Sequence, residues 1–111
     1  MRKGCLEMAV LASLWHGRLY GLEILRVLER DSSLVLAEGT IYPILNRLRN
    51  EGLLQSQWVE AAAGHPRKYY DLTQAGRDRV TRMVETWKQF SAGLDRLIEP
   101  VMKDKIVEQP L

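Results

Sequence analysis

The spacing of apolar residues predicts four helices and two short strands. Helical spacing fills residues 4–16, 18–31, 40–52 and 73–98. Residues 53–59 and 67–72 are typical of strands, and the segment between them lacks a regular pattern, as expected of a loop. We therefore expect a mainly α fold with a small β-hairpin wing, in which a winged helix-turn-helix domain precedes a long C-terminal dimerisation helix.

The first and last predicted helices carry more apolar surface than one small domain can cover. Residues 4–16 are apolar apart from Glu7 and Ser13, and a helix that is apolar on all sides needs cover on more than one side. The last helix has heptad spacing of apolar residues, with Val84 and Ile98 widening the stripe. A second copy of the chain is the natural cover. The predicted dimer interface contains Leu6, Val80, Met83, Trp87, Phe90, Leu94 and Leu97.

This pattern divides the chain into three parts. Residues 1–72 are expected to form the winged helix-turn-helix domain and residues 73–99 the dimerisation helix. Thr73 should cap this helix, which should run to about Ile98 and stop before Pro100. Residues 100–111 are expected to form a flexible tail.

The third predicted helix separates its apolar and polar side chains on opposite faces. Thr40 is expected to cap its start, Pro43 to occupy its first turn and Gly52 to end it. The expected buried stripe consists of Ile41, Ile44, Leu45 and Leu48. The opposite face is expected to carry Tyr42, Asn46, Arg47 and Asn50, with Thr40 and Arg49 on its flanks.

Charge changes this picture only locally. The net charge is +2 and the pI is about 8.8, which is a weak indication of a polyanionic partner. Four basic residues lie on the third helix and at the base of the wing: Arg47, Arg49, Arg67 and Lys68. Phosphates attract such cations, and Asn and Arg side chains read base edges in the major groove. Any surface helix has a polar face in contact with solvent, so the polar face of this helix alone does not indicate nucleic-acid binding. The additional cations of the wing favour it.

Three motifs in this region resemble the PadR family of transcriptional regulators. Residues 39–48 read GTIYPILNRL and are followed by EGL at 51–53, residues 64–76 read GHPRKYYDLTQAG, and residues 20–24 read YGLEI. Their residue types and uninterrupted spacing are similar to the family's third helix, wing and second helix. The resemblance covers roughly residues 4–98.

The resemblance implies a dimeric winged-helix repressor that binds double-stranded operator DNA. It carries over Tyr42, Arg47, Arg67 and Lys68 as DNA-contacting positions, and the face geometry adds Thr40, Asn46 and Asn50. Arg49 stands where the family usually has an acidic residue, and Asp71 where it often has a basic or small one, which bears on the operator and on local phosphate contacts. The alternative function is a winged helix that serves only protein–protein interaction.

The last helix also raises the possibility of a small-molecule effector. Short PadR-like proteins that sense drugs look similar here, and the resemblance implies that Trp87 lies in a flat slot across the dimer axis, where it would stack on a planar aromatic ligand. Met8, Val84 and Phe90 are expected to line the same slot. Packing within the interface explains Trp87 equally well. Trp15 and Trp58 are expected in the core.

No other chemistry has a supporting pattern. His16 and His65 stand alone without ligand-spaced partners, and no nucleophile–base pair or phosphate loop is present, so we expect no metal, no cofactor and no enzyme activity. Cys5 is the only cysteine and is expected to be a small buried thiol in a reducing compartment. The N-terminus lacks a secretory pattern and no apolar run is long enough for a bilayer, so a cytoplasmic location is expected.

Overall fold

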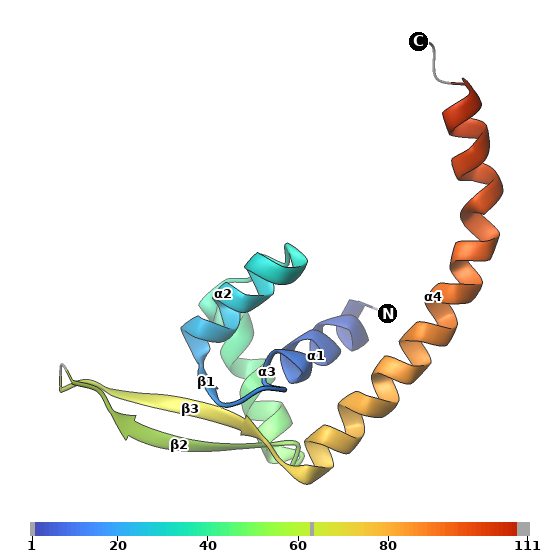
Figure 1. Cartoon of the computed structure of the whole chain (residues 1–111). Coiled ribbons are helices and arrows are strands. Elements are labelled where there is room, and N and C mark those ends of the chain that lie inside the picture. Colours follow the sequence, from blue (N-terminus) through green and yellow to red (C-terminus); the bar gives the residue numbers. More distant parts are fainter. Residues whose placement is uncertain (1, 63, 109–111) are drawn as a thin grey trace. The chain divides into compact units, whose positions relative to one another are not determined.

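The computed structural model describes residues 2–62 and 64–108. Its elements, shown in Figure 1, are α1 (Arg2–Ser13), β1 (Leu19–Tyr20), α2 (Gly21–Ser32), α3 (Glu38–Asn50), β2 (Leu54–Glu60), β3 (Pro66–Leu72) and α4 (Gln74–Glu108). The predicted fold class is confirmed: helices predominate, the sheet is small and antiparallel, and a long helix ends the chain. The chain divides within α4 into two compact units, Met1–Thr81 and Arg82–Leu111.

The core of the first unit combines helix stripes with one face of the sheet. α1 packs on α2, α2 on α3, and α3 on β2. The buried apolar side chains are Val10, Leu11, Leu14, Ile24, Leu28, Ile41, Leu45, Leu48, Leu53, Leu54, Tyr70, Leu72 and Val80. The α3 members of this set follow the predicted helical spacing, and burying each large side chain contributes about 1.5–3 kcal/mol. This stripe fixes which face of α3 turns away from the core.

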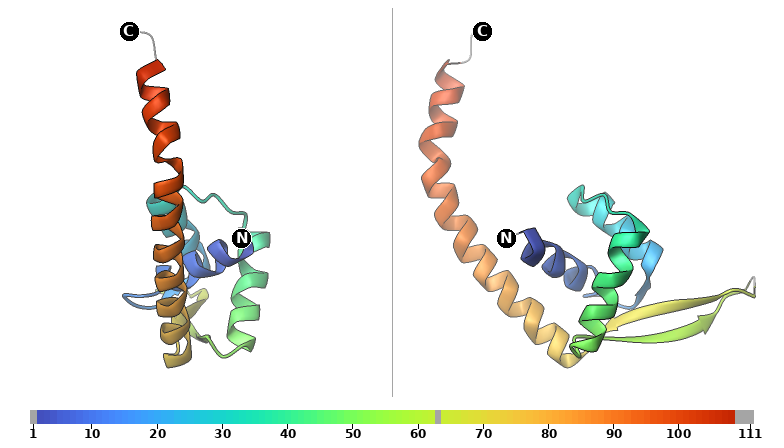
Figure 2. Two further views of the ribbon diagram at one scale, coloured as in Figure 1. Left: turned by 90° about the vertical axis from the view of Figure 1, so that its right-hand side faces the viewer. Right: turned by 180° about the vertical axis from the view of Figure 1, so that it is seen from behind.

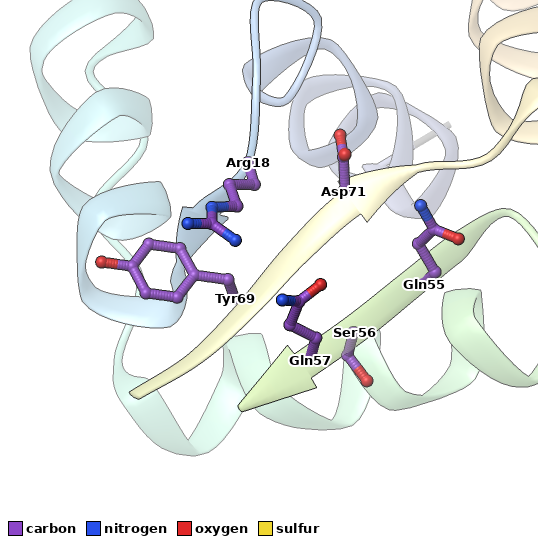
Figure 3. Close-up of a pocket in the computed structure, with 6 residues that line it drawn as sticks. All are labelled: Arg18, Gln55, Ser56, Gln57, Tyr69 and Asp71. Atoms are coloured by element: carbon purple, nitrogen blue, oxygen red, sulfur yellow. The ribbon is translucent and has the colours of Figure 1, made fainter. Parts of the chain in front are cut away.

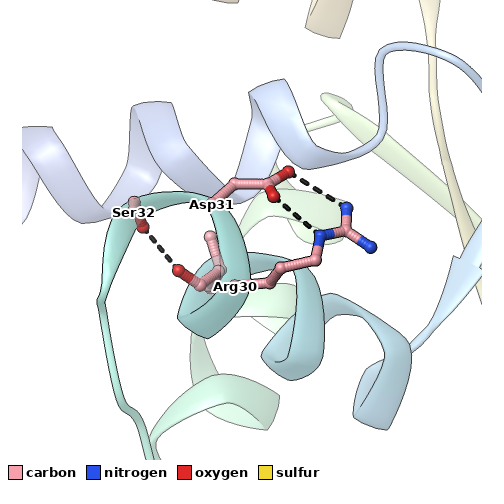
Figure 4. A network of polar contacts seen from close by, with 4 residues as sticks. Arg30, Asp31 and Ser32 are labelled. Atoms are coloured by element: carbon pink, nitrogen blue, oxygen red, sulfur yellow. Dashed lines mark hydrogen bonds and ion pairs between the residues drawn. The ribbon is translucent and has the colours of Figure 1, made fainter.

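The end of α2 confirms the stop that the sequence predicts after Asp31. Ser33 takes the left-handed conformation, with φ of 62°, and the helix ends at Ser32. The Ser32 hydroxyl donates a hydrogen bond to the carbonyl of Leu28, 2.6 Å away, and Arg30 Nε lies 2.7 Å from Asp31 Oδ1 (Figure 4). The hydrogen bond from Arg30 lowers the pKa of Asp31. Both side chains of this pair are exposed, so the pair is a surface feature.

The start of α3 differs from the prediction. Ala37 is at the N-cap and the helix begins at Glu38, so Thr40 lies inside the first turn and Pro43 falls in the second turn. The prediction that Thr40 caps this helix was wrong. Glycine is unfavourable inside a helix, so the helix was expected to begin after Gly39, but Gly39 is part of the first turn. Glu38 offsets that weakness, since an acidic side chain in the first turn is stabilised by the helix dipole.

The end of α3 is the glycine turn that the sequence predicts. Gly52 has φ of +79°, a conformation that glycine adopts without steric cost. Its N–H donates to the carbonyl of Arg49 at 3.0 Å, and the N–H of Leu53 donates to the carbonyl of Leu48 at 3.0 Å. This is the Schellman pattern, and it leads the chain directly into β2.

The sheet has the order β1-β3-β2, and both pairings are antiparallel. β1 was not predicted, because a strand of two residues is too short to show any alternation. In the hairpin Leu54 pairs with Leu72 and Trp58 with Lys68. Side chains alternate across a strand, so these four belong to the face that also holds buried Tyr70. The hairpin extends beyond the helices of its own unit, as Figures 1 and 2 show.

The start of α4 is bonded to the turn that ends α3. The Thr73 hydroxyl accepts a hydrogen bond from the N–H of Gly76 at 3.0 Å and donates one to the carbonyl of Gly52 at 2.6 Å, which confirms Thr73 as the cap. Gly76 is buried, and a Cβ at this position would lie 2.1 Å from the carbonyl oxygen of Leu53. A side chain of any size is therefore excluded where α4 leaves the sheet.

The predicted end of the last helix near Ile98 was wrong. α4 continues through Pro100 to Glu108. A proline inside a helix removes one backbone hydrogen bond and crowds the carbonyl one turn earlier, but Val101 and Met102 extend the apolar stripe beyond it. The flexible tail expected from residue 100 is thus helical to Glu108, and residues 109–111 lie outside the described residues.

Candidate nucleic-acid interface

An open groove of about 450 Å³ lies in the first unit between the start of α2, α3 and the hairpin. Its lining residues are Tyr20, Gly21, Leu22, Tyr42, Asn46, Trp58, Pro66, Arg67, Lys68 and Tyr70. The set combines four aromatic side chains, one amide and two cations, and none of these described lining residues is acidic. The groove therefore suits a partner that is negatively charged and also offers apolar surface.

The α3 side of the groove is formed by Tyr42 and Asn46, which lie one helical turn apart. Tyr42 lies against the first residue of α2, because a Cβ on Gly21 would be 2.6 Å from Tyr42 Oη and 2.7 Å from its Cε1. Gly21 thus makes room for the Tyr42 ring. This close approach explains physically why a glycine begins α2.

The hairpin side of the groove is formed by a tryptophan and a lysine that face each other across the two strands. Lys68 Nζ is 5.8 Å from the ring centroid of Trp58 and 5.8 Å from that of Tyr70. Burial raises the pKa of Tyr70, so its phenol stays neutral below this tryptophan and lysine. Lys68 therefore lies among aromatic rings that favour its positive charge.

Both tryptophans expected in the core are exposed, and that expectation was wrong. Trp58 is 65% exposed and Trp15 is 42% exposed. Trp58 is on the same sheet face as buried Leu54, but it lies nearer the tip of the hairpin and remains largely exposed. Trp15 follows α1 and lies under the guanidinium of Arg77, 4.8 Å from its ring centroid.

Arg67 follows the alternation of β3 and turns to the opposite sheet face from Lys68. Its guanidinium lies 4.6 Å from the ring centroid of Tyr20, whose ring is 5.5 Å from that of Tyr69 in an edge-on arrangement. Arg18 completes the row, 4.9 Å from the Tyr69 ring centroid. Arg67 therefore borders the groove from the outer face of the wing.

The outer face of the wing is polar and hollowed. A pocket of about 230 Å³ is lined by Arg18, Gln55, Ser56, Gln57, Tyr69 and Asp71 (Figure 3). In this view Gln57 of β2 lies beside Tyr69, and Gln55 lies on the side of Asp71, its partner on β3. Its acidic residue, Asp71, distinguishes this pocket from the groove on the inner face.

The structure does not bring Arg47 into the groove. Its Nη1 is 3.0 Å from Glu51 Oε2 and 3.8 Å from Glu7 Oε2, so it faces α1 instead. Glu7 also lies near Arg79 Nη1, at 3.5 Å, and its buried Oε1 makes no hydrogen bond within the described chain. Glu7 thus links α1, α3 and the first turns of α4. A contact between residues so far apart in sequence leaves no local signal.

Arg49 lies between α3 and the wing, outside the lining of the groove, and it was not among the DNA-contacting residues predicted from the sequence. Its Nη1 is 3.4 Å from Ser56 Oγ of the wing. At about 100° per residue, Arg49 is only about 20° around the helix from Tyr42, whereas Arg47 is about 140° away. The helical spacing could therefore have identified Arg49. Thr40 and Asn50 are exposed on α3 but do not line the groove.

Comparison with known proteins assigns the chain to a family. The PadR-like family of transcriptional regulators matches residues 10–82. The chain belongs to this family. A PadR-like transcription factor from Bacteroides fragilis is 37% identical, with a TM-score of 0.75 over 87% of this chain and 93% of that chain.

Further PadR-like structures have the same fold. A PadR-like regulator from Bacillus cereus is 30% identical, with a TM-score of 0.79 over 88% of this chain and 95% of that one. A PadR family regulator from Clostridium difficile is 28% identical, with a TM-score of 0.76 over 83% and 96% of the two chains. The resemblance seen in the sequence is thereby confirmed, and the protein is a PadR-like transcriptional regulator with a winged-helix fold.

The second unit of this PadR-like chain is the rest of α4, and it exposes a row of large apolar side chains. These are Val84, Trp87, Phe90, Leu94, Leu97, Ile98, Val101 and Met102. The rings of Trp87 and Phe90 have centroids 6.1 Å apart. Val80, one heptad before Trp87, is only 2% exposed and belongs to the core of the first unit, so it offers no surface to a partner.

The remaining candidates of the PadR-like chain lie in α1 or stand alone. Leu6, Met8 and the free thiol of Cys5 are half-buried. Within the described residues, no three His, Cys, Asp or Glu side chains cluster as metal ligands would. None of the helices in the described parts of the chain is both long and apolar enough to cross a membrane.

Proposed function

We propose that this PadR-like regulator is a repressor that binds operator DNA through the groove between α3 and the wing. The observation that carries the proposal is the lining of that groove, which combines Asn46, Arg67 and Lys68 with aromatic rings and contains no carboxylate among its described residues. Such a surface attracts phosphates and presents an amide to base edges. A module for protein–protein interaction would not require two adjacent cations of β3 at a groove whose described lining contains no carboxylate.

In the proposal α3 enters the major groove. Tyr42 and Asn46 face the bases, and Thr40 and Asn50, exposed on the same helix, reach the flanking backbone. Lys68 and Arg67 hold phosphates on either side of the wing, and Arg49 adds a cation beside Ser56. Arg47 takes a different role from the one expected: its ion pairs with Glu7 and Glu51 position α3 against α1.

A homodimer would supply the two copies of α3 that an operator with two half-sites needs. Trp87, Phe90, Leu94 and Leu97 form an exposed apolar row in the second unit, and a second copy would cover it. Met83 and, in the first unit, Leu6 complete the proposed interface. Two recognition helices must be about 34 Å apart to enter successive major grooves. Sedimentation at micromolar concentration should give twice the chain mass of 12.8 kDa, and a monomer would refute the dimer.

A planar aromatic effector is the finer part of the proposal. Trp87 is 39% exposed and has Phe90 beside it, and Val84 lies one turn earlier on α4. Two such rings from symmetry-related helices would stack on a flat molecule and change the separation of the recognition helices. Met8 is in the first unit and joins this site only as an expectation from the sequence. Quenching of Trp87 emission by planar dyes, lost in Trp87→Phe, is the test.

DNA binding is tested by gel shift and footprinting on the DNA upstream of the gene. The proposal places the protein in the cytoplasm together with its operator DNA. Lys68→Ala should weaken binding to every duplex and reduce the salt slope by about one unit, because one phosphate contact is lost. Lys88→Ala on α4 is the charge-matched control, since it removes a lysine that lies outside the groove. If the wild-type protein binds no duplex even at low salt, the result favours the alternative function, a module for protein–protein interaction.

A further inference from the structure

We propose that Trp58 and Lys68 together form a clamp for one sugar–phosphate unit of duplex DNA, in which Lys68 pairs with the phosphate and the Trp58 indole packs on the adjoining deoxyribose. The inference rests on the proposed DNA-binding function and adds to it a contact that carries no charge. Its starting point is the exposure of Trp58, at 65% of the side chain, on the face of the hairpin that borders the groove.

The strand register fixes the two side chains next to each other. Trp58 and Lys68 are direct partners across the antiparallel strands, so their side chains leave the same face. Lys68 Nζ lies 5.8 Å from the indole centroid. Sugar and phosphate alternate along a nucleic-acid strand, so a phosphate held by Lys68 places the next deoxyribose within reach of the indole.

The chemistry of the surroundings favours this occupant. The lining of the groove contains no carboxylate among the described residues, so a phosphate meets no repulsion there. Glu60, the next side chain on this face of β2, does not line the groove. A large exposed apolar ring beside a half-buried cation suits a partner that alternates apolar sugar with charged phosphate.

Contact with a sugar explains the geometry better than stacking on a base. A base in duplex DNA is already stacked, and freeing it costs a few kcal/mol per step. The indole lines the hairpin side of the groove, and Tyr42 and Asn46 line its α3 side. When α3 lies in the major groove of a duplex, the hairpin side is beside the sugar–phosphate backbone. The clamp therefore reads the position of the backbone, and binding through Trp58 should not depend on sequence.

The experiment separates an apolar contact from an ionic one by salt dependence. Binding of a mixed-sequence duplex is measured at several salt concentrations for wild type, Trp58→Ala, Trp58→Phe and Lys68→Ala. Trp58→Ala should weaken binding on the order of tenfold at every salt concentration with an unchanged slope, because it removes apolar contact area and no charge. Trp58→Phe should recover most of the affinity. Lys68→Ala should instead lower the slope.

A fluorescence titration provides a readout from the residue itself. In the Trp15→Phe, Trp87→Phe double variant, Trp58 is the only tryptophan, and its emission should shift or be quenched as duplex is added. Trp15→Ala is the matched control for affinity, because Trp15 lies outside the groove and contacts Arg77. Circular dichroism checks that each variant is folded.

The outcomes distinguish this inference from the function on which it rests. Wild-type affinity in Trp58→Ala, or silent Trp58 emission while the duplex binds, overturns the clamp and leaves DNA binding intact. A reduced salt slope in Trp58→Ala also overturns it, since the indole would then act only through Lys68. If wild type binds no duplex, the proposed function fails together with the clamp.

Discussion

Replacing Gly76 by alanine should strongly destabilise the fold, although it adds only one methyl group. Gly76 lies in the first turn of α4, where the helix leaves the sheet and passes the chain at Leu53. A Cβ at this position would be 2.1 Å from the carbonyl oxygen of Leu53 and 3.2 Å from Cδ2 of Leu72. The first neighbour is backbone, so no side-chain rotation relieves the clash.

The geometry sets the magnitude. Cβ atoms essentially never lie within 3.0 Å of another heavy atom, so α4 and Leu53 must separate by about 0.9 Å. Overpacking in a rigid core costs about 1–3 kcal/mol. The Leu53 carbonyl also accepts a 3.1 Å hydrogen bond from the N–H of Thr73, and straining that bond adds about 1 kcal/mol. We expect a loss of about 3 kcal/mol or more, a large share of the stability of a small domain.

Urea and thermal unfolding at a fixed protein concentration measure this loss. A loss of about 3 kcal/mol lowers the melting temperature by roughly 12 °C or more for a chain of this size. Gly39→Ala is the matched control, because Gly39 lies in a helix and has open space around its Cβ position. This substitution should raise the free energy of unfolding by about 0.4–1 kcal/mol. Equal unfolding midpoints for Gly76→Ala and wild type would refute the steric argument.

Two further substitutions test the groove and the ion pairs behind it. Gly21→Ala should displace the Tyr42 ring and weaken DNA binding while costing about 1 kcal/mol or less in stability, since the obstructing atoms end a side chain that can rotate; unchanged affinity in a gel shift would contradict this. Glu7→Gln should cost about 1 kcal/mol in urea unfolding and remove one negative charge beside Arg47, which keeps its pair with Glu51, so DNA binding at low salt should tighten; weaker binding would show that the pair with Glu7 is needed in the complex.

Local signals predicted most of the fold because they act within a few residues. The Gly52 turn and the Thr73 cap were found from residue type alone, since each satisfies backbone groups of its own helix end. β1 was missed because its pairing with β3 comes from tertiary contact and not from any alternation within two residues. The helix past Pro100 was missed because one lost hydrogen bond is a weaker signal than a continuing apolar stripe.

The candidate site was predicted in part. Tyr42, Asn46, Arg67 and Lys68 do meet at one groove, because helix spacing and strand register are both readable from the sequence. Arg47 does not join them, since it is paired with Glu51 one turn further along α3 and with Glu7, forty residues away along the chain. The exposure of Trp58 depends on how far the hairpin extends past the helices, which no local pattern reports.

Gly21 and Gly76 are both in close contact with neighbouring atoms, but they should vary differently among related sequences. Gly76 is required by the passage of one backbone past another, so every lineage that keeps the fold must keep it, whatever DNA it binds. Gly21 makes room for the ring of Tyr42, so a lineage that gave up that tyrosine would lose this reason to keep the glycine. Positions 21 and 42 should therefore vary together among related sequences, while position 76 stays glycine. Such a pattern would show that the DNA-binding surface changes in evolution while the fold is retained.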